Sequence, residues 1–359
     1  MRRILVILIL SLTAHHRMAI AQEPNQQKID FSGVEAFWKI AEKITNEKVT
    51  ETDWDYLFST GYYQFYANWG QRSHIQKTFV TALSPKKKME RDSLMEIPDF
   101  YSYILHQVIA TYANKTKLQT FQKNFAKSEI QKKIIARAKE FLPNDLNSKA
   151  YEPFIYFGVF QPDANASATS IAIDLKLCSE LADPIGLIAH EYHHFLTMNY
   201  RKKFKEIEND STSAIMKSIS QLQLEGIADM IDKDQFLNSD GRGFPSVLSK
   251  NFKRVHAEPL PALRKMDSLL IAISKEPLSA QRNSETIFNL LPLGGHPHGF
   301  YMAKTILHVY GKETLLTTVK NPFDFIRVYN NAYRTLNGIA IFSEETMTFL
   351  SLVEHTHSL

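Results

Sequence analysis

The chain has 359 residues, of which 44% are hydrophobic and 22% charged, and its formal net charge is +4 at pH 7. This is an ordinary globular composition, and it excludes a chain that is disordered throughout. A single cysteine, Cys178, excludes an internal disulfide, and because nothing beside it resembles a cysteine-hydrolase signature we interpret it as a small buried hydrophobic residue.

Residues 1–21 have the features of a secretory signal peptide. Arg2 and Arg3 precede an apolar run over 4–14, and residues 19–21 form a small-x-small cleavage signal. The run is shorter than the ~20 residues that span a bilayer, so we expect cleavage after Ala21, export to the periplasm or the medium, and no transmembrane segment afterwards. Its three arginines leave with it, which lowers the net charge from +4 to +1, and nucleic acid is therefore not expected as a partner.

The region 22–150 is predicted to be helical. The stretch "SGVE" over 32–35 matches a capping box. Apolar residues follow it at helical spacing, namely Val34, Phe37, Trp38, Ala41 and Ile44. Amphipathic, aromatic-rich segments continue to about residue 143, which gives a helical N-terminal part.

Strand signals are confined to the next segment. Residues 153–160 and 169–177 are rich in β-branched and aromatic residues, and 161–168 between them has turn chemistry, so the pattern predicts a β-hairpin. Asp183 and Pro184 then provide an N-cap and a first-turn proline for a helix. A second helix runs through 222–232, a break follows at 241–245, and helices resume to the end, one of them starting at 321–322. The predicted fold is α+β and predominantly α-helical, with a small sheet beside the first of these helices and helical N- and C-terminal parts.

The first of these helices contains the segment "LIAHEYHHFL". His190, Glu191 and His194 fit H-E-x-x-H, and side chains four apart on a helix lie on one face, so both imidazoles can bind one ion. Glu191 is then placed to act as general base on a zinc-activated water. His193 offers a second pairing at i, i+3, which we consider less consistent with that role for Glu191.

A catalytic zinc of this type needs a third protein ligand. Glu225, in "LQLEGIADMID", is surrounded in sequence by apolar residues, and Asp229 lies one turn later on the same face. Carboxylates on a solvated face would not have such neighbours. We therefore predict Glu225 as the third ligand of one Zn²⁺ ion, with Asp229 orienting an imidazole through its free N–H.

Together, "HEYHH" and the later "EGIAD" resemble the gluzincins, metallopeptidases that combine H-E-x-x-H with a distal glutamate. The wider stretch 153–335 is similar to a poorly characterised group of bacterial zinc-dependent peptidases, through "SIAIDL", these two motifs and "GHPHGFYMAKTI". The resemblance implies zinc held by His190, His194 and Glu225, Glu191 as general base, and a substrate cleft lined by an edge strand, here "TSIAIDL". The spacing to Glu225 is longer than in the thermolysin-like members, and Leu224 stands where those carry asparagine. The expected regions are thus 1–21, 22–150 and a peptidase region over 151–359.

A further polar cluster lies in "LGGHPHGFYMAK", over 293–304. Peptide hydrolysis requires hydrogen-bond donors aimed at the oxyanion. His298 or Tyr301 could provide one, and His296 is a third candidate beside them. The alternative interpretation is a loop histidine and an ordinary core tyrosine.

These signals predict a secreted zinc metallopeptidase whose partner is a peptide or protein substrate. One rival hypothesis is a secreted, non-catalytic zinc-binding interaction protein, which would not need Glu191. Another is a metal-free helical scaffold in which the polar residues pair with one another. No G-x-S-x-G, P-loop or dinucleotide motif supports another enzyme class.

Overall fold

The structure, a computed structural model, describes residues 28–146, 152–205, 212–238, 246–276 and 280–358. The predicted signal peptide lies outside the described residues. The chain divides into two compact units. Unit 1 contains the residues up to Ala136 and those from Tyr151 to Phe195, and unit 2 contains Arg137–Ala150 and Leu196–Leu359. Within the described ranges, no helix combines the length and the apolar character needed to cross a membrane.

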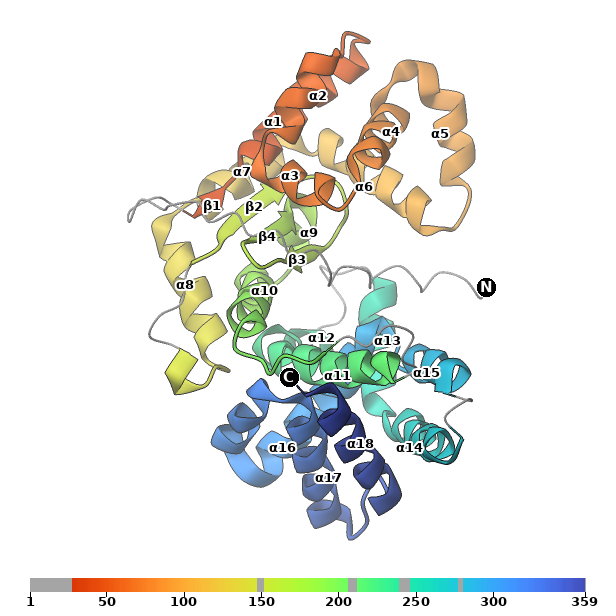
Figure 1. Cartoon of the computed structure of the whole chain (residues 1–359). Coiled ribbons are helices and arrows are strands. Elements are labelled where there is room, and N and C mark those ends of the chain that lie inside the picture. Colours follow the sequence, from red (N-terminus) through yellow and green to blue (C-terminus); the bar gives the residue numbers. More distant parts are fainter. Residues whose placement is uncertain (1–27, 147–151, 206–211, 239–245, 277–279, 359) are drawn as a thin grey trace. The chain divides into compact units, whose positions relative to one another are not determined.

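Unit 1 consists of a small sheet and helices on either side of it in the sequence. Its strands are β1 (Ile29–Asp30), β2 (Phe154–Gly158), β3 (Ala164–Ala166) and β4 (Ser170–Asp174). Its helices are α1 (Ser32–Thr45), α2 (Glu51–Phe58), α3 (Gly61–Ala67), α4 (Arg72–Leu83), η1 (Pro85–Lys87), α5 (Lys88–Met95), α6 (Phe100–Ala113), α7 (Lys115–Phe125) and α9 (Leu175–Glu180). Two more, α8 (Ser128–Lys139) and α10 (Pro184–Met198), begin in this unit and end in unit 2. In Figure 1, α1 and α3 lie next to β2.

The sheet is mixed, with the strand order β1-β2-β4-β3. The predicted hairpin is wrong, because β2 and β4 pair in parallel, with Ile155 opposite Ile171. Three residues of the predicted turn form β3 instead, which pairs antiparallel with β4. All five residues of β4 are buried, and strands that are buried on both faces are typical of parallel pairing.

Strand β4 ends at Asp174, whereas the predicted strand extends to residue 177. The Asp174 carboxylate accepts a hydrogen bond from the backbone N–H of Leu177 at 2.9 Å and so caps α9. The same carboxylate accepts the N–H of Phe160 at 3.2 Å. The expectation that "TSIAIDL" is an edge strand is also wrong, since β4 lies between β2 and β3, and β3 is at the edge.

Helix α1 forms where the spacing of apolar residues predicts it. Val34, Phe37, Trp38, Ala41 and Ile44 are all buried. The predicted capping box is wrong, because Ser32 is already helical and its backbone N–H donates to the Asp30 carboxylate at 2.6 Å. Asp30 thus provides the acceptor that the sequence pattern assigned to Ser32.

Unit 2 is helical in its described part. Its elements are η2 (Asn144–Leu146), α11 (Ser213–Asp232), α12 (Asp234–Asn238), α13 (Ser246–Ala257), α14 (Leu260–Lys275), α15 (Ala280–Asn289), η4 (Leu293–Gly295), α16 (His296–Thr317), η5 (Thr318–Lys320), α17 (Pro322–Asn337) and α18 (Glu344–His357). The predicted start of α17 is confirmed, since Asn321 accepts the N–H of Phe323 at 3.1 Å and Pro322 follows it.

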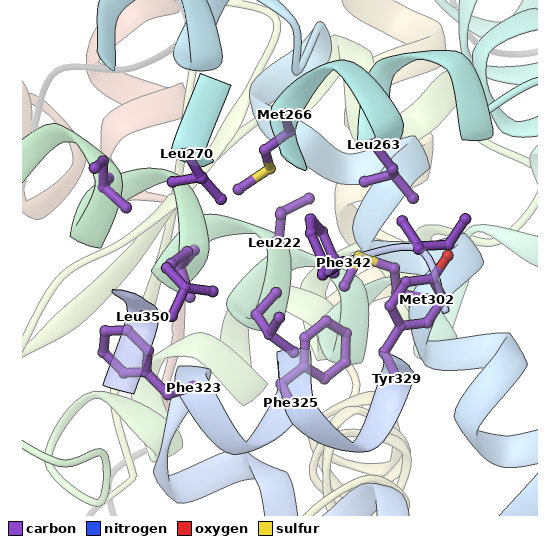
Figure 2. Packing of buried hydrophobic residues seen from close by; sticks show 14 of the residues in the cluster. Leu222, Leu263, Met266, Leu270, Met302, Phe323, Phe325, Tyr329, Phe342 and Leu350 are labelled. Atoms are coloured by element: carbon purple, nitrogen blue, oxygen red, sulfur yellow. The ribbon is translucent and has the colours of Figure 1, made fainter. Parts of the chain in front are cut away.

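The core of unit 2 joins α11, α14, α16, α17 and α18. Figure 2 shows buried side chains from these helices facing one another, among them Leu222, Leu270, Met302 and Phe323. Burying a leucine or phenylalanine side chain of this kind stabilises a fold by roughly 1.5–3 kcal/mol. This core fixes α11 and α16 relative to each other, and both helices carry predicted site residues.

The predicted fold class is confirmed: the protein is α+β and predominantly helical, with one small sheet. The division into regions at residue 150 stays a prediction. The boundaries of the two compact units differ from these predicted regions, because β2, β3 and β4 belong to unit 1 together with the preceding helices.

Candidate metal centre

Helix α10 holds the first half of the candidate site. It starts where the sequence predicts, because the Asp183 carboxylate accepts the N–H of Gly186 at 2.9 Å and Pro184 occupies the first turn. The helix begins with apolar residues, and Leu187, Ile188 and Ala189 are buried. The histidines that follow therefore project from a helix with a fixed start.

His190 and His194 face each other on α10. Their Nε2 atoms are 2.9 Å apart. Two imidazoles on one tetrahedral zinc, with Zn–N bonds of about 2.0–2.1 Å, place their nitrogens about 3.3 Å apart. The pair therefore fits the donor chemistry and the spacing of a zinc site after a small outward movement of the rings.

The neighbouring polar residues of this helix are buried as well. His190 is 2% exposed and Glu191 8%. His193 is also buried, and its ring centroid lies 6.3 Å from that of His194, compared with 4.5 Å between His190 and His194. The i, i+4 pairing thus brings two ring nitrogens close together, and its preference over the pairing of His190 with His193 stays a prediction.

Helix α11 of unit 2 holds the predicted carboxylates. The side chain of Asp229 is fully buried, and that of Glu225 is 16% exposed. Leu222 and Ile227 beside them are buried. Glu225 and the histidine pair belong to different units, so their meeting at one ion is part of the proposal below.

His296 connects the two carboxylates within unit 2. Its Nδ1 lies 2.9 and 3.1 Å from the two carboxylate oxygens of Asp229. Its Nε2 lies 3.4 Å from Oε2 of Glu225, an ion-pair distance. Burial lowers the pKa of His296, but Asp229 and Glu225 outweigh this and raise the pKa above its usual value.

Lys233 also contacts the Asp229 carboxylate. Its Nζ is 3.2 Å from the Asp229 carboxylate and 2.7 Å from that of Asp232. Burial lowers the pKa of Lys233, and the two aspartates reverse this and raise it, so the ammonium stays charged. Lys233, Asp229, His296 and Glu225 form a row of groups in contact, buried at Asp229 and partly exposed at the other three residues, which we call the α11–α16 polar row.

The polar row depends on a close approach of α11 and α16. A Cβ atom on Gly226 would lie 2.4 Å from the carbonyl carbon of Gly299, and one on Gly299 would lie 2.2 Å from the carbonyl oxygen of Leu222. Only glycine allows backbones this near to each other. The contact falls between Glu225 and Asp229 on one helix and just after His296 on the other.

The two predicted oxyanion donors also lie in α16. His298 is 1% exposed, and burial followed by the nearby His256 lowers its pKa to about 4, so the ring is neutral at pH 7. Tyr301 is half-buried and packs against the core of unit 2. Burial raises the pKa of Tyr301, so its hydroxyl keeps the proton that a donor needs.

The roles of His296 and Lys233 were not identified from the sequence. The available signal was the position of Lys233, four residues after Asp229 on the same helix, where side chains meet. For His296 there was no comparable signal, because it is 67 residues from Asp229 in the chain.

Comparison with known proteins gives one match. A family model described as "Putative zinc dependent peptidase (DUF5700)" matches residues 54–338. This region starts well before the motifs at 153–335 and includes most of the helices of unit 1. Neither the curated proteins nor the solved structures contain a match to the chain.

Proposed function

Because this chain belongs to the family described as "Putative zinc dependent peptidase", we propose that it hydrolyses peptide bonds with one zinc ion held by His190, His194 and Glu225. The observation that carries the proposal is the pair of facing Nε2 atoms, 2.9 Å apart, on a buried helical segment. Two imidazoles and a carboxylate are the ligand set of catalytic zinc sites that keep a fourth position open.

Zinc in such a site polarises a carbonyl and makes water acidic near pH 7. The chain's own residues perform the proton transfers. Glu191 follows His190 directly in α10 and is nearly buried, so its carboxylate is shielded from bulk solvent. We assign it the removal of a proton from the attacking water and the delivery of that proton to the leaving amine.

The developing oxyanion needs a hydrogen-bond donor, and removing one typically costs about 100- to 1,000-fold in rate. We propose that His298 or Tyr301 donates this bond. Both carry a proton at pH 7 on a neutral side chain, which the shifts of their pKa values support.

The proposed substrate is a peptide or protein. The resemblance to gluzincins assigns substrate binding to an edge strand, and in this sheet the edge strand next to β4 is β3, Ala164–Ala166. An extended substrate could pair with its outer edge, as peptides add to exposed strands in other proteins. We also propose export through the signal peptide over residues 1–21.

The decisive experiment combines metal analysis with cleavage of a peptide library. Purified wild-type protein should contain one zinc per chain and cleave library peptides, and a chelator should stop the cleavage. Glu191→Gln should keep its zinc and lose about 100- to 10,000-fold in rate, since general-base catalysis contributes this much. Glu96→Gln is the matched control, because Glu96 is exposed, and it should cleave like wild type.

Other outcomes contradict the proposal in distinct ways. A protein that binds zinc and cleaves nothing would be a zinc-binding interaction protein. Purified protein that contains no zinc would support the third hypothesis, a metal-free helical scaffold. A Glu191→Gln variant as fast as wild type would remove the assigned base.

A further inference from the structure

The polar row in unit 2 contains a histidine that the zinc proposal does not use. His296 is the first residue of α16, and its ring lies between two carboxylates one turn apart on α11. Its Nδ1 contacts both oxygens of Asp229, and its Nε2 lies 3.4 Å from Oε2 of Glu225. One ring therefore links the deepest carboxylate of the row to the proposed zinc ligand.

We propose that His296, held by Asp229, positions the Glu225 carboxylate for binding the metal. The inference rests on the proposed function, because it assumes that Glu225 is a zinc ligand. It makes His296 a positioning residue, which acts through Glu225.

The position of the ring is fixed by the backbone on both sides. Gly295 precedes it in the left-handed conformation, with φ of 85°, and Pro297 follows it in the first helical turn. Two residues further on, the backbone contact between Gly226 and Gly299 sets the separation of α11 and α16. The imidazole therefore has little freedom to leave the two carboxylates.

The other end of the row is fixed as well. Lys233 neutralises part of the negative charge of Asp229 and Asp232, and the side chain of Asp229 is fully buried. A buried carboxylate paired in this way keeps its orientation, because moving it would leave a charge without a partner. Asp229 can therefore hold the ring, and the ring can hold Glu225.

Direct binding of His296 to zinc is the main alternative. Its Nε2 faces Glu225, so it could in principle reach the same ion. A fourth protein ligand would fill the position that a catalytic zinc keeps for water or substrate. A contact that orients a ligand from outside the coordination shell agrees better with the proposed hydrolysis, and losing one typically costs 10- to 100-fold in metal affinity or activity.

The test is zinc affinity, measured on full-length protein by competition with a chromogenic chelator. His296→Ala should bind zinc 10- to 100-fold more weakly than wild type. His308→Ala is the matched control, since His308 is exposed on the same helix, and it should keep wild-type affinity. Circular dichroism and urea unfolding report whether each variant folds. If His296→Ala does not fold, His296→Gln takes its place, with a smaller loss expected.

A double mutant separates positioning from direct binding. In a Glu225→Ala background, His296→Ala should cause no further loss of affinity, because the residue that it positions is already absent. An additional loss in that background would show that His296 is itself a ligand and would overturn the inference. Wild-type affinity in both single His296 variants would overturn it as well.

Failure of the proposed function gives a different result. In that case wild type binds no zinc, or His190→Ala binds it as tightly as wild type. If His190→Ala loses zinc while His296→Ala does not, the zinc site stands and only the role of His296 is wrong.

Discussion

Replacing Gly226 with alanine should push α11 and α16 apart and loosen unit 2. The new Cβ would lie 2.4 Å from the carbonyl carbon and oxygen of Gly299 and 2.8 Å from its Cα. Carbon contacts are comfortable at about 3.5 Å or more, so the helices must separate by roughly 1 Å. Strain of this kind typically costs about 1–3 kcal/mol.

Two further effects of this substitution have opposite signs. Alanine is a better helix former than glycine by up to about 1 kcal/mol, which offsets part of the strain. A 1 Å shift would lengthen the 2.9 Å contact between His296 and Asp229 beyond hydrogen-bonding distance, which costs about 1 kcal/mol or more for a charged partner. We therefore expect a net destabilisation of about 1–3 kcal/mol.

Hydrogen exchange of the α11 and α16 amides, together with urea unfolding, measures this effect in unit 2. All three tryptophans, Trp38, Trp54 and Trp69, belong to unit 1, so their fluorescence should change little. Gly338→Ala is the matched control: its φ is 73° and a Cβ there meets nothing within 4 Å, so it should cost only the ~1–2 kcal/mol of a left-handed residue. Unchanged protection of α11 and α16 in Gly226→Ala would refute the argument.

Two other predictions concern unit 1. Burial raises the pKa of the Asp174 carboxyl from 3.8 to about 7, so its contribution to stability is complete below about pH 4 and is lost as the pH rises through 7. The free energy of unfolding of wild type should therefore fall by roughly a few kcal/mol between about pH 4 and 7. Urea unfolding followed by tryptophan fluorescence measures this, and Asp174→Asn should show a weaker dependence of the unfolding free energy on pH. The same dependence on pH in both proteins would contradict the prediction. Asp183→Ala removes the cap of α10 and should lower the stability by about 0.5–2 kcal/mol. Hydrogen exchange should then be faster at the first amides of that helix. Exchange as slow as in wild type would show that the cap is not needed.

Local chemistry made several helix starts predictable. Two helices, α10 and α17, begin where a side chain that can accept a hydrogen bond is followed directly by a proline, whose φ is already helical. These pairs are Asp183 with Pro184 and Asn321 with Pro322. The histidine pair was predictable for the same reason, since i, i+4 spacing on a helix decides by itself that the two rings can meet. At these positions the structure depends only on residues that are neighbours in the sequence, so the sequence pattern was sufficient to predict it.

Pairing between distant segments was not predictable in this way. The parallel register of β2 and β4, and the addition of the two-residue strand β1 beside β2, depend on contacts far apart in the chain. The apolar runs in β2 and β4 fit a hairpin and a parallel pair equally well, because periodicity reports burial and not direction. Ser32 also matched a capping pattern, yet Asp30 supplies the acceptor.

The α11–α16 polar row shows the same limit within the candidate site. Glu225 and Asp229 could be selected from their apolar neighbours, and both lie on one helix. The histidine that joins them comes from another helix, and its approach depends on two glycines whose importance is visible only once the helices are packed. The proposed ligand was therefore easier to find than the residues around it.

The chain passes between the two units three times, since Arg137–Ala150 belongs to unit 2 while the segments before and after it belong to unit 1. No single cut can therefore release either unit as one continuous fragment. During synthesis, β1 emerges from the ribosome long before β2, its neighbour in the sheet. Closing such long loops is slow, so truncated forms ending near residue 150 should be targets for chaperones and proteases.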